Sequence, residues 1–283
     1  MILHTMDFIK KTLLVTLLTI CISCNNKTEP NQVPIPQKGL VTSKAMVVSA
    51  RKEASKIGTD ILKKGGNAFD AMIATEMALA VTYPYAGNLG GGGFMIYRKS
   101  NGETGALDYR EKAPMSSSRD MFLDKDGNPI PEKSQRGPLA VGVPGTVAGI
   151  FATYKKFGTL PIKEILTPVV NLAKKGYVIT EKQQKRFEKY RNVFIETNGD
   201  TILYAHKHKV LDTVKNINLA HTLERIIENG QSEFYKGKTG RKLVDFIQAK
   251  GGIITLEDLS NYKAIWRTPI TCLLYTSPSP RDA

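Results

Sequence analysis

Apolar and polar residues alternate at helical spacing over residues 51–64, and two glycines follow. This pattern predicts an amphipathic helix that ends at Gly65, because glycine readily takes the left-handed conformation of a helix stop. A second helix is predicted from Asn67, a good N-cap residue, to about Val81. Small apolar residues occupy nearly every side of this second helix, so we expect it to be buried in the core.

The pattern changes to that of strands after a glycine-rich segment at residues 87–93. Two apolar runs, 94–97 and 104–109, flank the turn dipeptide Asn101-Gly102 and together predict a β-hairpin. Arg110 stands where the second strand ends.

Helical patterns dominate the rest of the chain, after a turn predicted at residues 124–127. The predicted helices run over about 144–156, 161–175, 180–191, 217–229 and 232–250, and one more short helix starts at Thr255. Two buried helices, a hairpin and a helical array indicate an α+β fold in which helices are layered on a sheet.

The composition is that of an ordinary globular chain with a basic surplus. Its 283 residues are 41% hydrophobic and include 3 cysteines, which excludes a disordered chain and a disulfide scaffold. The 40 Lys and Arg against 26 Asp and Glu leave a net charge of +14. The densest basic cluster interleaves with Glu181 and Glu188 on a predicted helix, which is typical of a solvated face, so we expect no nucleic-acid partner. The cluster consists of Lys182, Lys185, Arg186, Lys189 and Arg191.

The first residues resemble an export signal. An apolar stretch at residues 12–23 is too short to span a bilayer as a helix, so residues 1–23 are predicted to be a signal peptide. Cys24 resembles the lipidated cysteine of a bacterial lipoprotein, followed by a tether over residues 24–38, and a cleaved signal without lipidation is the alternative. We expect an exported protein, periplasmic or held at a membrane only through its lipid anchor.

Two other motifs are explained without a ligand. The glycine-rich segment leads from a helix into a strand, the reverse of a dinucleotide-binding loop, and the sequence before Gly237-Lys238-Thr239 lacks the first glycine of a Walker loop. We predict instead that the glycine run serves close backbone packing. His206 and His208 lie on one face of a predicted strand without a clear third ligand, so a basic surface loop is the favoured interpretation. We expect no metal and no cofactor.

Arg110 is the main candidate for a functional residue. A guanidinium at the end of a strand is positioned to project from the sheet edge into a cleft, where its planar fork can grip a carboxylate with two hydrogen bonds. The alternative is an ion pair with Asp108 or Glu111, and the residues alone favour this alternative.

Five separated segments resemble the γ-glutamyltransferase family, also called γ-glutamyltranspeptidase or glutathione hydrolase. They occur in that family's order, and the similarity runs over residues 39–271, most of the family's large subunit. The segments are 65–71 (Gly-Gly-Asn-Ala-Phe-Asp-Ala), 86–95 (Ala-Gly-Asn-Leu-Gly-Gly-Gly-Gly-Phe-Met), 108–114 (Asp-Tyr-Arg-Glu-Lys-Ala-Pro), 143–149 (Val-Pro-Gly-Thr-Val-Ala-Gly) and 233–237 (Glu-Phe-Tyr-Lys-Gly).

The resemblance implies an N-terminal-nucleophile hydrolase with an αββα layered core, made as a proenzyme that cuts itself into a large and a small subunit. The N-terminal threonine of the small subunit would attack the γ-glutamyl amide of glutathione and related compounds, and water, an amino acid or a peptide would then take the glutamyl group. Arg110 occupies the family's position for binding the α-carboxylate of the substrate, so the resemblance reverses the preference for an ion pair.

The sequence departs from the family at its C-terminal end. The family's Thr-Thr-His-containing nucleophile segment occurs nowhere in the 283 residues. No catalytic residue is therefore assigned within this chain. The small subunit is missing, so we expect the layered core to be incomplete and the chain to be inactive alone. Residues 272–283 look like translated non-native sequence, with a natural disordered tail as the alternative.

Two other functions stay open at this point. One is a relative in the same superfamily that removes the acyl side chain of β-lactams. The other is a non-catalytic lipoprotein that keeps Arg110 as a carboxylate receptor.

Overall fold

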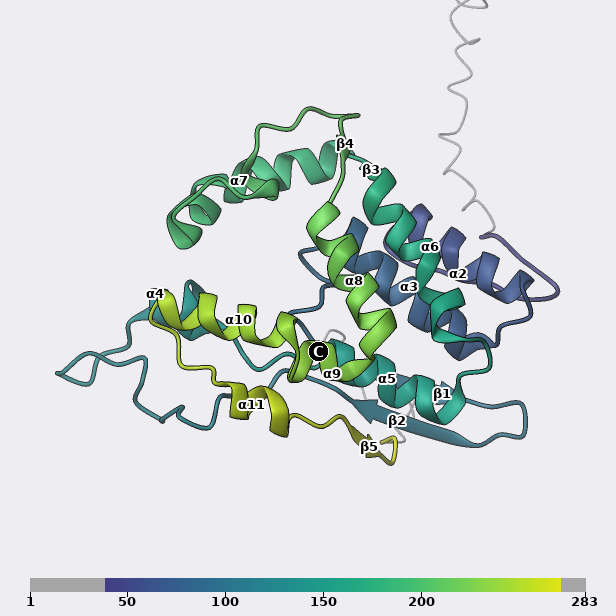
Figure 1. Ribbon diagram of the computed structural model, residues 1–283, viewed down its shortest axis with the longest axis horizontal. Helices are drawn as coiled ribbons and strands as arrows, with labels where there is room; N and C mark the ends of the chain where they lie inside the picture. The colour runs from purple at the N-terminus through teal and green to yellow at the C-terminus, as the bar shows by residue number, and fades with distance from the viewer. Residues whose placement is uncertain (1–38, 271–283) are drawn as a thin grey trace, which may run out of the picture. The chain divides into compact units, whose positions relative to one another are not determined.

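The computed structural model describes residues 39–270 (Figure 1). A compact unit begins at Ala45, and its described part is 45–270, whereas residues 39–44 belong to a separate N-terminal unit. The predicted signal peptide, the lipidated Cys24, the tether over 24–38 and the tail over 272–283 lie outside the described residues.

The first two predicted helices form as expected. Helix α2 spans Lys52–Lys63 and is followed by Gly65, whose φ of 93° is the left-handed conformation predicted for the stop. Helix α3 spans Ala68–Thr82 and begins with a capping box, because the Asn67 side chain accepts hydrogen bonds from Phe69 N and Asp70 N. Ten of its residues are buried, so α3 is the central core helix that its apolar composition predicts: Asp70, Ala71, Ile73, Ala74, Thr75, Met77, Ala78, Ala80, Val81 and Thr82.

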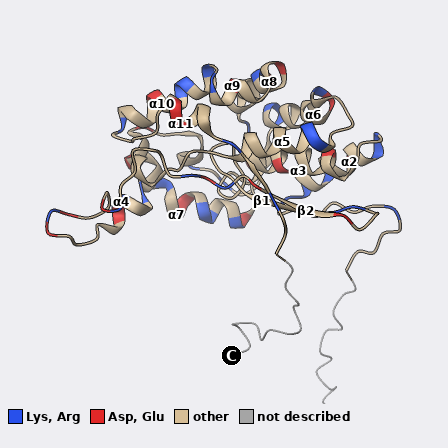
Figure 2. Ribbon diagram, turned by 90° about the horizontal axis from the view of Figure 1, so that it is seen from below, with Lys and Arg blue, Asp and Glu red and all other residues tan. Residues whose placement is uncertain are grey.

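The predicted hairpin is the centre of a three-stranded antiparallel sheet. Strands β1 (Phe94–Arg98), β2 (Thr104–Asp108) and β5 (Ile265–Arg267) lie in the order β1-β2-β5. Met95 pairs with Leu107, and both are buried on the face covered by helices, as Figure 2 shows for α3 and α5. The pattern of alternating residues did not predict β5, because three residues are too few to show an alternation.

Most of the remaining helices confirm the predicted array. Helix α7 extends seven residues beyond the predicted end and stops at Gly199, whose φ of 72° is left-handed. Two short strands, β3 and β4, pair with each other as a second sheet. The elements are α4 (Pro131–Gln135), α5 (Thr146–Phe157), α6 (Ile162–Lys175), β3 (Tyr177–Val178), α7 (Glu181–Asn198), β4 (Thr213–Val214), α8 (Ile217–Asn229) and α11 (Leu256–Asn261).

The helix predicted over 232–250 is wrong as a single element. Helix α9 (Gln231–Tyr235) ends before Gly237, and α10 (Lys238–Ala249) begins after it. The Glu233 carboxylate accepts hydrogen bonds from Thr239 N at 3.1 Å and from Thr239 Oγ1 at 2.7 Å, so it caps the start of α10 from the preceding helix. The hydrogen bonds between Glu233 and Thr239, six residues apart, require the helix to be interrupted between these two residues.

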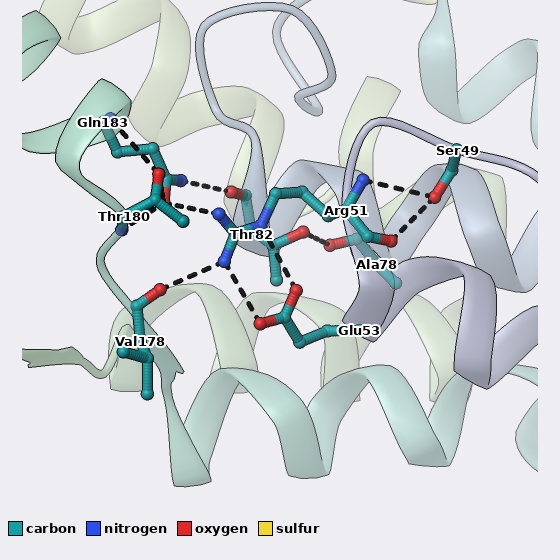
Figure 3. A network of polar contacts seen from close by, with 8 residues as sticks. All are labelled: Ser49, Arg51, Glu53, Ala78, Thr82, Val178, Thr180 and Gln183. Atoms are coloured by element: carbon teal, nitrogen blue, oxygen red, sulfur yellow. Dashed lines mark hydrogen bonds and ion pairs between the residues drawn. The ribbon is translucent and has the colours of Figure 1, made fainter. Parts of the chain in front are cut away.

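A buried arginine joins α7 to the first two helices (Figure 3). Arg51, which is 7% exposed, donates to Gln183 Oε1 at 2.6 Å and to Val178 O at 3.1 Å, and it forms an ion pair with Glu53. Gln183 in turn donates to Thr82 O at 2.9 Å. Gln183, which forms the capping box of α7 with Thr180, therefore also connects that helix to the end of α3.

The basic cluster of α7 lies beside acidic residues, as Figure 2 shows. Lys185 pairs with Glu181 at 2.5 Å, and the Arg186 guanidinium lies 4.2 Å from the centre of the Tyr85 ring. These local partners agree with the interpretation of the cluster as a solvated helix face.

Candidate functional site at Arg110

Arg110 lies two residues after the end of β2, and both polar groups of its backbone are hydrogen-bonded. Its N–H donates to Asp108 Oδ1 at 3.1 Å, and its carbonyl accepts from the Tyr262 hydroxyl at 2.7 Å. The side chain of Arg110, in contrast to its backbone, is largely exposed to solvent, with 67% of its surface accessible. The backbone of Arg110 is therefore fixed while its guanidinium faces solvent at the end of the strand.

The glycine-rich segment packs directly against this backbone. Gly93 and Tyr109 exchange two backbone hydrogen bonds of 3.3 Å and 3.0 Å, which extends the hairpin by one pair. A Cβ atom on Gly92 would lie 2.5 Å from Tyr109 O and 2.8 Å from Glu111 N. A side chain at this position would push the Arg110 segment away, so the run serves the close packing that the sequence predicts.

The N-terminal end of α5 meets the same place. Gly145 N and Thr146 N donate to Gly91 O at 2.8 Å and 3.0 Å, and a Cβ atom on Gly145 would collide with Tyr109 O. Lys112 and Val143 also exchange backbone hydrogen bonds of 3.2 Å and 2.7 Å. The segment 143–149 is thus hydrogen-bonded both to the glycine-rich segment, at Gly91, and to the chain that follows Arg110, at Lys112.

Tyr235 brings the segment 233–237 into the arrangement. Its hydroxyl donates to Pro144 O at 2.8 Å and accepts from Ala148 N at 3.1 Å. Its ring stacks on Tyr262, with centroids 5.8 Å apart and planes 10° apart. Four of the five segments that carry the family resemblance therefore converge around the main chain of Arg110.

The fifth segment has a different place and role. Asn67 Nδ2 donates to Phe157 O at 2.7 Å, and Asp70 accepts from Thr159 Oγ1 at 2.5 Å and from Thr159 N at 3.1 Å. These contacts tie the beginning of α3 to the loop that follows α5. The segment 65–71 supports the core and does not reach Arg110.

The guanidinium has two near neighbours, and one of the ion pairs considered from the sequence is present. Arg110 Nε lies 3.3 Å from Glu111 Oε2, and the guanidinium carbon lies 5.9 Å from the centre of the Phe94 ring. Asp108 instead forms an ion pair with Arg267 at 2.8 Å. The Arg110 N–H and the ion pair with Arg267 hold the pKa of Asp108 below its ordinary value. An exposed pair such as Arg110–Glu111 contributes little free energy, so a carboxylate from solution can compete for the guanidinium.

Glu76 is a polar residue near the site that the sequence analysis missed. The Tyr109 hydroxyl donates to both carboxylate oxygens of Glu76, at 3.0 Å and 3.2 Å. Burial raises the pKa of Glu76 to about 7, and the hydrogen bond from Tyr109 offsets part of this effect. Both residues line a cavity of about 740 Å³ together with Phe94, Met95 and Ile96. The run 68–81 is otherwise mostly apolar and contains two acids, Asp70 in the first turn of the helix and Glu76 in its middle. An acid in the middle of such a helix is the signal that could have marked Glu76 in the sequence.

The other sequence motifs lie apart from this arrangement. His206 and His208 follow a 3₁₀ turn and lie in a loop, which confirms the favoured interpretation of a surface loop. The strand on which the two side chains would have shared a face does not form. His208 Nε2 is 2.8 Å from Leu203 O. Within residues 39–270, no three His, Cys, Asp or Glu side chains gather as metal ligands. Over the same range, no helix is both long and apolar enough to cross a lipid bilayer.

Comparison with known proteins relates the chain to one family. The sequence model for Gamma-glutamyltranspeptidase matches residues 54–277. The chain is 44% identical to the glutathione hydrolase proenzyme of Escherichia coli over 244 residues, which is 83% of this chain and 42% of that protein. It therefore spans less than half the length of this curated relative.

Solved structures show the same relationship. The crystal structure of the Helicobacter pylori γ-glutamyltranspeptidase aligns with a TM-score of 0.79 and 40% identity, covering 82% of this chain and 67% of that one. A cephalosporin acylase from Bacillus halodurans aligns with a TM-score of 0.68 and 25% identity, covering 85% of this chain and 47% of that one. These neighbours confirm the α+β fold of an N-terminal-nucleophile hydrolase. With a matching sequence model over most of its length and with four signature segments gathered at one strand end, the chain belongs to the γ-glutamyltranspeptidase family.

Proposed function

We propose that this chain is the large-subunit part of a γ-glutamyltransferase and glutathione hydrolase proenzyme. The observation that carries the proposal is the convergence of the signature segments on the backbone of an exposed strand-end arginine in a member of this family. The whole enzyme cleaves the γ-glutamyl amide of glutathione and transfers the glutamyl group to water, an amino acid or a peptide.

Arg110 binds the α-carboxylate of the γ-glutamyl donor in this proposal. A guanidinium presents two parallel N–H groups that match the two oxygens of a carboxylate, and a fixed backbone sets where the fork stands. The α-carboxylate and the scissile carbonyl lie at opposite ends of the glutamyl group. Holding one end therefore places the other at a constant distance from the anchor, which lowers the entropic cost of reaching the reactive geometry.

The bond-making groups are supplied by polypeptide other than the 283 residues. A threonine hydroxyl forms an ester with the γ-carbonyl carbon, the amide C–N bond breaks, and the threonine's proton passes through its own α-amino group to the leaving amine. Water or an acceptor amine then attacks the ester and releases the threonine. The described chain contributes the anchor, Arg110, and the segments that hold its backbone.

The N-terminal part of the proposal concerns location. We propose that the protein is exported and that Cys24 is its lipid attachment point. Metabolic labelling with a radioactive fatty acid in a bacterial host tests this directly. Label that persists in a Cys24→Ser variant would contradict lipidation at this residue.

The test of the function begins with the DNA that follows the codon of Thr271 in the source genome. We expect a continuous frame that encodes the threonine segment. The complete gene product, expressed and self-cleaved, should then release p-nitroaniline from γ-glutamyl-p-nitroanilide. No release from this donor, with release from the corresponding glutaryl amide, would favour the acylase function.

The receptor alternative is tested on the 283-residue chain itself. Isothermal titration with glutamate and with glutathione should give no specific binding at micromolar ligand, because the proposed site is completed by other polypeptide. Saturable micromolar binding by this chain would favour a carboxylate receptor.

A further inference from the structure

Tyr262 makes the long-range contact that fixes Arg110. It follows α11 in the sequence, it is 5% exposed, and its hydroxyl donates to Arg110 O at 2.7 Å across 152 residues of sequence. The Asp108 side chain holds the N–H on the other side of the same residue. The N–H of Arg110 is therefore held by a neighbouring side chain, and its carbonyl is held by a residue far along the chain.

The ring of Tyr262 is itself held in place. It stacks on Tyr235, whose hydroxyl bonds to Pro144 O and Ala148 N at the start of α5. Lys112 Nζ lies 4.9 Å from the centre of the Tyr262 ring on the chain that follows Arg110. The direction of the hydroxyl is thus set by packing and does not depend on its single hydrogen bond.

The hydroxyl keeps its proton under physiological conditions. Burial, together with the negative charges of Asp108 and Glu111, raises the pKa of Tyr262 to about 12. A phenol with this pKa keeps its proton throughout the neutral range and can donate it to the Arg110 carbonyl there.

We propose that Tyr262 is a positioning residue, which holds the main chain of Arg110 so that the guanidinium meets the α-carboxylate of a γ-glutamyl donor in a constant place. The inference rests on the proposed function and adds to it a residue that touches no substrate. Tyr262 acts only through Arg110, and Tyr235 acts through Tyr262 by stacking.

The kinetic test uses Tyr262→Phe in the complete gene product. Phenylalanine keeps the stack on Tyr235 and removes only the hydroxyl. We expect the KM for the γ-glutamyl donor to rise about five- to tenfold, the range that corresponds to one lost hydrogen bond. The kcat should stay within about twofold, because an anchor on a non-reacting carboxylate acts equally in the ground state and the transition state.

A matched control separates positioning from a general loss of structure. Tyr154 also carries a hydroxyl with one backbone partner, since it accepts from Ile162 N at 3.1 Å at the end of α5. Tyr154→Phe should leave both kinetic constants unchanged. An equal KM for Tyr262→Phe and the parent, in an enzyme whose KM responds to Arg110→Lys, would overturn the proposal.

A second measurement does not depend on activity. Hydrogen–deuterium exchange of the 283-residue chain should be faster in a peptide covering residues 109–113 in Tyr262→Phe than in Tyr154→Phe. If the complete gene product fails to cleave γ-glutamyl donors, the proposed function fails, and the exchange result still decides whether Tyr262 holds Arg110. Unchanged exchange in that peptide would show that it does not.

Discussion

At the scale of single residues, the site separates a fixed backbone from an exposed side chain. The Arg110 backbone is held by Asp108 and Tyr262, whereas among residues 39–270 its guanidinium has the Glu111 carboxylate and the face of the Phe94 ring nearby. The sequence locates Arg110, because a strand end is a local feature. It does not locate Tyr262 or Glu76, because each meets its partner only after distant segments have packed.

At the scale of single residues, Glu76 predicts how the free energy of unfolding depends on pH. Its pKa in the folded chain is about 7 and its ordinary value is 4.5, so the folded state binds more protons than the unfolded state between these values. The stabilisation from the neutral carboxyl is complete below pH 4.5 and is lost as the pH rises toward 7. We expect the free energy of unfolding to fall by about 2 kcal/mol over this window, less than the full shift implies because Glu76 is half-buried.

Urea unfolding of the parent and of Glu76→Gln, measured from pH 5 to pH 8, isolates this contribution. Glutamine keeps an acceptor for the Tyr109 hydroxyl and does not titrate. The difference in unfolding free energy between the two proteins should shift in favour of the variant as the pH rises from 5 to about 7, and it should level off above pH 7. A difference that is constant over the whole range would contradict the raised pKa.

At the scale of elements, local signals predicted the starts of three helices well. The caps at Asn67, Thr180 and Thr255 all form, because each needs only residues within one turn of the helix. Two of the departures from the sequence predictions have the opposite origin. Strand β5 exists because it pairs with β2, and the break between α9 and α10 exists because Glu233 bonds to Thr239. Neither partner is visible in a pattern of apolar residues.

A prediction at the scale of elements concerns Asn67, because its side chain makes two separate sets of hydrogen bonds. Its Oδ1 accepts from Phe69 N and Asp70 N to cap α3, and its Nδ2 donates to Phe157 O. Asn67→Ala loses both sets and should destabilise the chain by about 2 kcal/mol. Asn67→Asp keeps the cap and should lose about half as much. Equal losses in urea unfolding of the two variants would mean that the cap contributes nothing.

At the scale of the whole chain, one face of the sheet is covered and the other is open. Met95 and Leu107 are buried beneath helices, whereas Phe94 is 62% exposed and Ile96 is 76% exposed on the opposite face. Exposed apolar residues on a sheet favour association with other polypeptide. The chain also spans less than half the length of its Escherichia coli relative.

The open face predicts how the 283-residue chain behaves alone. We expect it to self-associate at micromolar concentration, and Ile96→Lys should shift it toward the monomer in sedimentation velocity. Leu211→Lys is a matched control, because Leu211 is also 76% exposed but lies in a loop. If the loop substitution dissolves the aggregates as well as the sheet substitution does, the sheet face is not the contact.

The central claim, that Arg110 anchors the α-carboxylate of the donor, is tested most directly by the KM of Arg110→Lys for γ-glutamyl-p-nitroanilide in the complete gene product. Lysine keeps the charge and loses the bidentate fork, so the KM should rise at least about tenfold. Arg119→Lys, at an arginine that is 96% exposed and pairs only loosely with Asp120, should leave the KM unchanged. An unchanged KM for Arg110→Lys, in a folded and self-cleaved enzyme, would contradict the claim.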